Sequence, residues 1–153
     1  MLRILVDADA CPVKDEIYRV ALRYGCPVIL VANQWMRIPR EGAVEMEVVK
    51  GDFDAADDRI VELTETDDVV ITADIPLAGR CLEKGARVLG PKGKPFTEDN
   101  IGDALASREL LADLRATGEV SGGPPPMQKK DRSLFLQKLD QVIQAIRREH
   151  GVT

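Results

Sequence analysis

Residues 2–9 read LRILVDAD, a short apolar run that ends in two aspartates. A second apolar run, VILVA, fills residues 28–32, and between the two runs a helical pattern starts at Pro12 and ends at Gly25. Apolar runs of this length are typical of strands inside a parallel sheet, and Pro and Gly favour the two ends of a helix. The segment therefore predicts a strand–helix–strand unit, from which parallel α/β sheets are built.

The same alternation of strand and helix continues outward from this unit. Residues 44–49 alternate apolar and acidic side chains, which indicates an edge strand with one buried face. The other expected elements are strands at 69–72 and 86–90, helices at about 54–65, 75–84 and 98–117, and a Gly/Pro-rich loop at 91–97. We therefore expect an α/β fold of three layers, with a mostly parallel sheet of about five strands and helices on both faces.

The C-terminal part of the chain has a different composition. Residues 1–117 form the predicted α/β domain, and residues 118–130 are rich in Gly and Pro, as a linker is. Residues 131–150 carry an apolar helical face made of Leu134, Phe135, Leu139, Val142, Ile143 and Ile146. A single amphipathic helix is not stable alone in water, so we expect this one to pack on the same domain.

The composition restricts the chemistry. The 153 residues include three cysteines in no paired spacing and one histidine, His150, near the end. These residues give no basis for a disulfide framework, a structural zinc site or a Ser-His-Asp triad, so carboxylates must carry any catalysis. No apolar run approaches the ~20 residues that span a bilayer, and charges at Arg3 and Asp7 come too early for a signal peptide. We expect a soluble cytoplasmic protein with no membrane partner.

The net charge of −5 argues against a large non-specific nucleic-acid surface. Two local groups of cations stand out against this acidic background. Arg37 and Arg40 form the first group, and Lys129, Lys130 and Arg132 form the second.

Aspartates follow three of the predicted strands. Asp7 and Asp9 follow the first strand, Asp57 lies in the helix after the third, and Asp74 follows the fourth. In an open parallel sheet, ligands bind beyond the carboxyl ends of the strands, so these side chains should share one edge. Crowded carboxylates repel one another, and hard oxygen-seeking ions such as Mg²⁺ or Mn²⁺ relieve the repulsion. The pattern therefore predicts a metal site built on Asp7, Asp57 and Asp74.

Helical geometry selects Asp57 among the aspartates of residues 54–58. At about 100° per residue, Asp57 lies on the same inner face as Ile60, whereas Asp58 points sideways to solvent. A structural alternative stays open because aspartate also caps helices. The candidate caps are Asp9 for the first helix, Asp52 or Asp54 for the second and Asp74 for the third.

Several motifs in the chain resemble the YaiI/YqxD family of bacterial proteins. They are DADACP at 7–12, VANQ at 31–34, FDAAD at 53–57, ITADIPLA at 71–78, GGP at 122–124 and DR at 131–132. The fold of this family is grouped with PIN-like domains, which are metal-dependent nucleases with acidic residues clustered at the strand ends. The resemblance implies a three-layer PIN-like (Rossmann-like) fold and metal-dependent cleavage of RNA or DNA.

The resemblance also implies roles for particular residues. By position, Asp7, Asp57 and Asp74 correspond to catalytic acids, and Asp9 to a fourth metal ligand. A PIN-like site has a further acid after the fifth strand, but residues 89–91 carry none, which leaves the number of bound ions open. The residues expected to hold the nucleic acid are Lys14, Asn33, Thr72, Lys130 and Arg132. Trp35 could stack on a base, anchor its loop or contact a second copy of the chain.

Two other functions remain open. Asp7 and Asp9 after the first strand also fit a phosphohydrolase of the haloacid-dehalogenase kind, with Asp7 as the nucleophile and Asp9 as the acid and base. Against this reading, Cys11 occupies the position where that family has Thr or Val, and the acidic pair Asp57-Asp58 precedes Thr72. The other possibility is a non-catalytic regulatory module that binds metal or nucleic acid. Oligomerisation is left open by the sequence.

Overall fold

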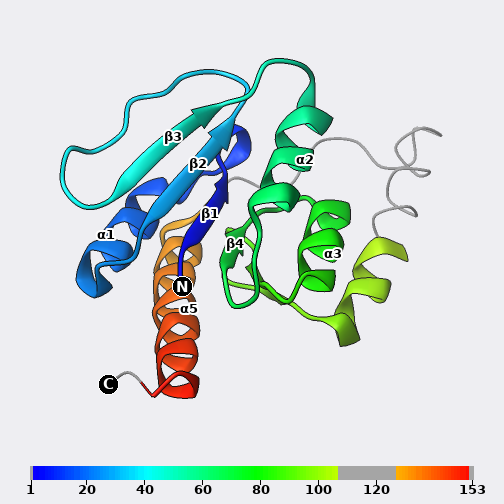
Figure 1. Ribbon diagram of the computed structural model, residues 1–153. Coiled ribbons are helices and arrows are strands. Elements are labelled where there is room, and N and C mark those ends of the chain that lie inside the picture. The colour runs from blue at the N-terminus through cyan, green and yellow to red at the C-terminus, as the bar shows by residue number, and fades with distance from the viewer. Residues whose placement is uncertain (1, 107–126, 152–153) are drawn as a thin grey trace.

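The computed structural model describes residues 2–106 and 127–151, and these form a three-layer α/β fold of the Rossmann-like type (Figure 1). Within these ranges, the sheet has six strands in the order β3-β2-β1-β4-β5-β6. The strands are β1 (Ile4–Asp7), β2 (Val28–Ala32), β3 (Val44–Val48), β4 (Val69–Ile71), β5 (Arg87–Leu89) and β6 (Pro95–Phe96). The first five pair in parallel, and β6 pairs antiparallel with β5. The predicted α/β class and the mostly parallel sheet are confirmed.

The strand order reverses beside β1. Ile4 of β1 is paired with Val28 of β2 on one side and with Val69 of β4 on the other. The chain first builds outward from β1 to β3, then returns and builds from β4 to β6. Such a reversal is the point at which open α/β sheets bind ligands, at the carboxyl ends of the strands. The ends of β1 and β4 therefore frame the expected site.

Helices cover both faces of the sheet (Figure 1). The helical elements are η1 (Ala8–Ala10), α1 (Lys14–Tyr24), α2 (Phe53–Leu63), α3 (Ile75–Glu83), residues 98–106 and α5 (Lys129–Glu149). The helices α1 and α5 pack on one face, and α2 and α3 pack on the other. The helical residues 98–106 lie beside α3, where Ile101 faces Gly79.

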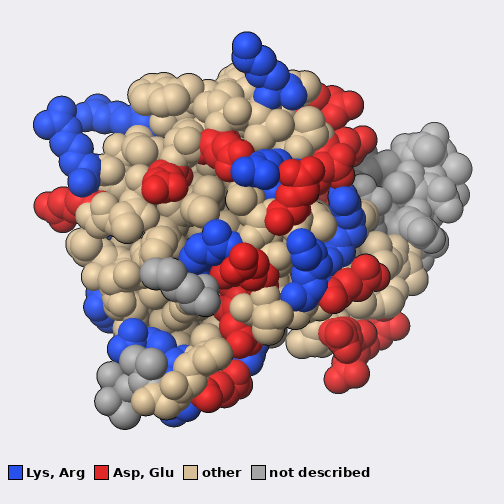
Figure 2. Space-filling view, viewed as in Figure 1, with Lys and Arg blue, Asp and Glu red and all other residues tan. Residues whose placement is uncertain are grey.

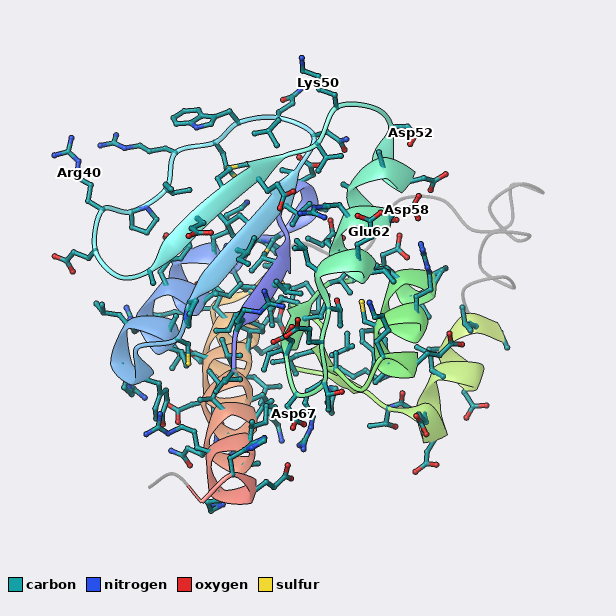
Figure 3. All side chains as sticks on the ribbon, in the orientation of Figure 1. Arg40, Lys50, Asp52, Asp58, Glu62 and Asp67 are labelled. Carbon is teal, nitrogen blue, oxygen red and sulfur yellow. The ribbon has the colours of Figure 1, made fainter. Side chains whose placement is uncertain are left out.

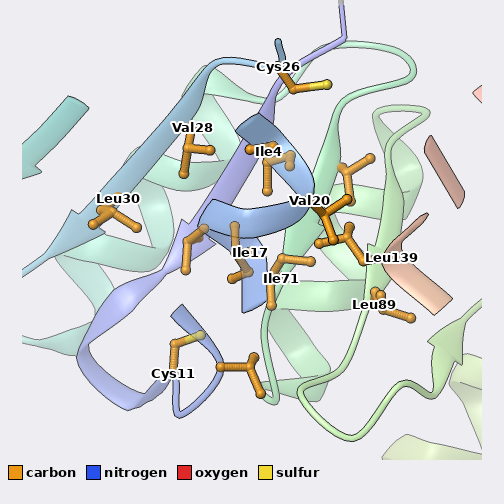
Figure 4. Packing of buried hydrophobic residues seen from close by; sticks show 14 of the residues in the cluster. Ile4, Cys11, Ile17, Val20, Cys26, Val28, Leu30, Ile71, Leu89 and Leu139 are labelled. Atoms are coloured by element: carbon orange, nitrogen blue, oxygen red, sulfur yellow. The ribbon is translucent and has the colours of Figure 1, made fainter. Parts of the chain in front are cut away.

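Each central strand contributes side chains to both faces, because successive residues of a strand point in opposite directions. Ile4 and Val6 belong to the cluster that includes Ile17 of α1 and Leu139 of α5 (Figure 4). Leu5, which lies between them in sequence, packs in the second cluster under α2 and α3. Asp7, two residues after Leu5, therefore lies on the α2/α3 side of the sheet.

The helix ends follow from local sequence. Gly25 adopts a left-handed backbone with φ 67° after α1, a conformation that glycine reaches without steric cost. Asp52 and Asp74 accept hydrogen bonds from Ala55 N at 3.1 Å and Leu77 N at 2.9 Å. They are thus the N-caps of α2 and α3, as the structural alternative predicted. Asp9 caps no helix, because the residue before α1 is Val13, which makes no side-chain cap.

Helix α5 completes the core on the α1 side of the sheet. Phe135, Leu139, Ile143 and Ile146 are buried in the same cluster as the strand residues. Asp140 accepts hydrogen bonds from the side chains of Arg23 and Tyr24 at the end of α1. Leu134, which we expected on the buried face, is 43% exposed and lies against the turn at Gly93.

Three predicted segments differ from the structure or lie outside it. We expected about five strands and a loop at 91–97, but Pro95 and Phe96 form a sixth strand. We did not expect the 3-10 turn η1 after β1. The second half of the helix expected at 98–117, and residues 118–126 of the expected linker, lie outside the described residues. No helix in the described ranges has the length and apolarity needed to cross a membrane.

Candidate functional site

Asp7 and Thr72 meet where β1 and β4 end. Side chains two residues apart in a strand point to the same face. Leu5 and Val70 pack under α2 and α3, so Asp7 and Thr72, each two residues further on, also lie on that side of the sheet. The Thr72 hydroxyl donates a hydrogen bond to Asp7 Oδ2 at 2.9 Å. Parallel pairing of β1 with β4 thus places these two side chains at one edge.

The same hydroxyl also positions Asp74. The backbone N–H of Asp74 donates to Thr72 Oγ1 at 3.0 Å, while the Asp74 carboxylate caps α3. Thr72 itself is only 2% exposed. We expected Thr72 to contact substrate, and that expectation stays a prediction. In the structure its hydroxyl donates to the Asp7 carboxylate and accepts from the Asp74 backbone N–H, so it holds the Asp7 carboxylate and the backbone at Asp74 in place.

Asp57 approaches this pair from α2. Its side chain is half-buried, and its pKa is raised from 3.8 to about 6, first by burial and then by the negative charges of Asp74 and Asp7. The next residue, Asp58, is exposed and forms an ion pair with Arg80 at 2.9 Å (Figure 3). The two neighbours differ as the helical projection predicted, with Asp57 facing the sheet edge and Asp58 facing solvent.

The three carboxylates form a crowded acidic group without a cation. Burial raises the pKa of Asp7, as do the charges of Asp74 and Asp9 to a smaller extent, while the Thr72 hydrogen bond opposes the change. Among the described residues, no lysine or arginine forms an ion pair with Asp7, Asp57 or Asp74. Arg80 lowers the pKa of Asp57, but by less than burial and the charges of Asp74 and Asp7 raise it, so the repulsion is only partly balanced in this part of the chain.

Asp9 and Asn33 extend the edge toward β2 and β3. Asn33 N donates to Asp9 Oδ2 at 2.8 Å, so the exposed Asp9 is tied to the loop after β2. The Asn33 Nδ2 group donates to the carbonyls of Val49, Gly51 and Asp52. Its Oδ1 is buried and has no partner in the described ranges, which leaves one acceptor beside the acidic group. The sequence signal for Asn33 was only its place directly after a strand.

The donor set has the chemistry of a hard divalent cation, since all its ligand atoms would be oxygens. Among the described residues, Asp7, Asp9 and Asp74 each use one carboxylate oxygen in a hydrogen bond, and the other oxygen has no such partner. However, the described residues contain no group of three or more His, Cys, Asp or Glu side chains already arranged to hold a metal ion. The carboxylates are close enough to perturb one another but do not form a closed coordination shell.

The basic residues expected at the site make their hydrogen bonds and ion pairs elsewhere in the described part of the chain. Lys14 donates to the carbonyl of Cys11 at 3.0 Å, and Arg132 donates to the carbonyl of Pro12 and pairs with Glu16. These contacts bring the start of α5 to the loop after η1, on the α1 side of the sheet. Lys130 is exposed. Lys14 and Arg132 thus contact the α1 side of the sheet, and among the described residues neither pairs with Asp7, Asp57 or Asp74.

Fold and site together define an α/β protein with a Rossmann-like sheet and an acidic group at the point where the strand order reverses. Residues 5–145 match the family model described as "Uncharacterized BCR, YaiI/YqxD family", and the chain belongs to this family. The family resemblance inferred from the motifs is confirmed.

Relatives match along almost the whole chain. The UPF0178 protein RC1_2062 of Rhodospirillum centenum is 57% identical over 152 residues, covering 97% of this chain and 99% of the relative. The UPF0178 protein amb2838 of Paramagnetospirillum magneticum is 54% identical over 148 residues, covering 97% of this chain and 98% of the relative. No solved structure matches the chain.

Proposed function

We propose that this protein is a divalent-metal-dependent nuclease that hydrolyses phosphodiester bonds in RNA or DNA at Asp7, Asp57 and Asp74. The observation that carries the proposal is the convergence of three carboxylates, from β1, α2 and the start of α3, at the reversal of strand order. Keeping like charges together in a partly buried place opposes folding. Carboxylates whose pKa is raised by burial and by like charges, as here, cluster at functional sites.

The three aspartates differ in the hydrogen bonds that hold their carboxylates. Thr72 fixes Asp7, and the α3 cap fixes Asp74, so these two present oxygens in set positions. Asp57 makes no hydrogen bond among the described residues and is free to turn toward the other two. A divalent ion held there would supply positive charge for the phosphate and lower the pKa of a bound water.

The test is a cleavage assay on end-labelled single-stranded RNA, single-stranded DNA and duplex DNA, with Mn²⁺, Mg²⁺ or EDTA. We expect metal-dependent cleavage that falls by at least ~10–100-fold in Asp7→Asn and Asp57→Asn, as when a metal's ligand environment is damaged. Asp58→Asn is the matched control, because it removes a charge from the same helix at a position that faces solvent. A parent protein that cleaves none of these substrates, or variants as active as the parent, would contradict the proposal.

A non-catalytic module that binds metal or nucleic acid is the second candidate. It is favoured by the open arrangement of the carboxylates, which are neighbours without a complete coordination shell in the described residues. Titration calorimetry separates the two candidates. Binding of Mn²⁺ by the parent, weakened by Asp7→Asn and accompanied by no cleavage, would support the module.

A further inference from the structure

The loop between β2 and β3 exposes the only tryptophan of the chain. Its residues alternate: Met36 and Ile38 pack against the core cluster, whereas Trp35 is 71% exposed and Arg37 is exposed. Met36 and Ile38 therefore anchor the loop, and Trp35 does not. A large indole left exposed on an anchored loop gains no free energy of burial for the fold, and tryptophan is enriched where partners bind.

Cations lie on the same loop and directly after β3. Arg37, Arg40 and Lys50 are all exposed, and none of them forms an ion pair among the described residues. Other arginines in the chain, such as Arg59 and Arg80, are paired with carboxylates. Figure 2 shows blue side chains projecting at the top and the left of this face, where Figure 3 labels Lys50 and Arg40. A net charge of −5 makes such a local excess of positive charge notable.

Asn33 connects these cations to the acidic group. Its Nδ2 donates to the carbonyls of Val49 and Gly51, on either side of Lys50, at 3.2 and 3.3 Å. Its backbone N–H donates to Asp9. Trp35 lies two residues after Asn33. The hydrogen bonds of Asn33 therefore join the segment that carries the indole to the segment that carries Lys50, at the carboxyl edge of the sheet. Trp35 and Lys50 thus start beside the carboxyl edge that carries the site, and the loop with Arg37 and Arg40 leads away from it toward the start of β3.

We propose that Trp35, Arg37, Arg40 and Lys50, together called the Trp35 surface, bind single-stranded nucleic acid and lead it to the acidic group. An unpaired base stacks on the exposed indole, and the cations contact phosphates on either side of it. Exposed aromatics combined with cations bind unpaired strands, because every unpaired base has a free π-face. In a duplex the bases are stacked on one another, and the indole cannot reach their faces. The inference rests on the proposed function and names its substrate class.

Because Trp35 is the only tryptophan, its fluorescence reports stacking directly. The full-length protein is titrated in EDTA, where no cleavage occurs, with a single-stranded oligonucleotide and with the matching duplex. We expect the single strand to quench the emission and the duplex to bind more weakly. Affinity should fall steeply with salt, because each phosphate contact releases counterions.

Single substitutions test the residues of the Trp35 surface one at a time. Trp35→Ala should weaken binding of a labelled single strand by about 5–100-fold, as loss of one stacking platform does. Arg37→Gln and Lys50→Gln should each lower the salt dependence by roughly one phosphate contact. Arg148→Gln is the control: it removes an exposed arginine at the far end of α5, and we expect parent affinity.

The outcomes distinguish this inference from the nuclease proposal. Asp7→Asn should bind the single strand as well as the parent while losing cleavage. If the parent cleaves nucleic acid but Trp35→Ala binds and cleaves as the parent does, the Trp35 surface is refuted and the nuclease stands. If the single strand quenches Trp35 but nothing is cleaved, the surface stands and the nuclease is refuted. Equal affinity for duplex, or sedimentation showing a dimer that Trp35→Ala abolishes, would also overturn the inference.

Discussion

Burial and the neighbouring charges of Asp74 and Asp7 raise the pKa of Asp57 from 3.8 to about 6. The folded protein therefore holds this proton more tightly than the unfolded chain does. Asp57 thus contributes stability that is fully present below about pH 4 and is lost as the pH rises through about 6. At neutral pH its charge opposes folding.

Asp57→Asn should consequently stabilise the metal-free protein at pH 8 and have little effect at pH 4. We expect a rise in Tm of about 2–4 °C at pH 8, which corresponds to about 1 kcal/mol for a chain of this size after allowance for solvent screening. Thermal denaturation followed by circular dichroism at the two pH values measures it. Asp58→Asn should give no such rise, since that residue has an arginine partner. A loss of stability at pH 8 would show that Asp57 is not held among like charges.

Metal binding by Asp7 has a separate signature. A ligand that binds only the folded state raises Tm, so Mn²⁺ should raise the Tm of the parent more than that of Asp7→Asn. The expected difference is a few degrees at an ion concentration about 100-fold above the dissociation constant. Mg²⁺ and Ca²⁺ titrations on both proteins complete the measurement. Equal shifts would exclude Asp7 as a ligand.

At the scale of elements, α5 contributes core residues that no other helix replaces. Leu139→Ala should destabilise the protein by about 2–5 kcal/mol, the usual cost of emptying a buried leucine position. Leu134→Ala, on the same helix but 43% exposed, should cost much less. Urea denaturation of the two variants makes the comparison. Similar losses in both would mean that α5 does not pack as described.

The elements that the sequence predicts best are those with a strong pattern. The apolar run 28–32 became β2 with the same limits, and Gly25 ended α1 as expected. Periodicity could not reveal β6, because it has only two residues and one is a proline. Nor could it reveal η1, which is a single turn. Contacts between distant segments, such as Asn33 with Val49, depend on the order of strands, which a single sequence does not specify.

Part of the candidate site could also be predicted from the sequence. The rule that parallel strands end at one edge selects Asp7 and Asp74, and the helical projection selects Asp57. For Asp74 the cap alternative is confirmed, since one carboxylate oxygen caps α3. Its other oxygen has no hydrogen-bond partner among the described residues, so the site role stays a prediction beside the cap. The hydrogen bonds that join Thr72 to the Asp7 carboxylate and to the Asp74 backbone could not be predicted. They depend on the direction of side chains at the ends of two paired strands.

At the scale of the whole molecule, the two core clusters share one sheet. Removing α5 exposes the side of β1 that carries Ile4 and Val6, while Leu5 on the other side stays covered. A chain that ends at Thr117 should therefore lose its cooperative thermal transition. Circular dichroism with temperature tests this expectation, with the full chain as the control. Should the shortened chain melt cooperatively and still bind Mn²⁺, α5 would be dispensable for both fold and site.

The position of β3 at the end of the sheet has a consequence for the protein in concentrated solution. Its outer side has no strand partner among the described residues, and an open edge of this kind can pair with the same edge of another molecule. Glu45 and Glu47 lie along this strand, and such charges discourage edge-to-edge pairing. Glu47 also pairs with Arg59 of α2, so Glu45 is the exposed charge that a substitution can remove without breaking an ion pair. Glu45→Gln should therefore favour aggregation through β3 while the fold stays intact, and a lysine introduced at Val48 should oppose it.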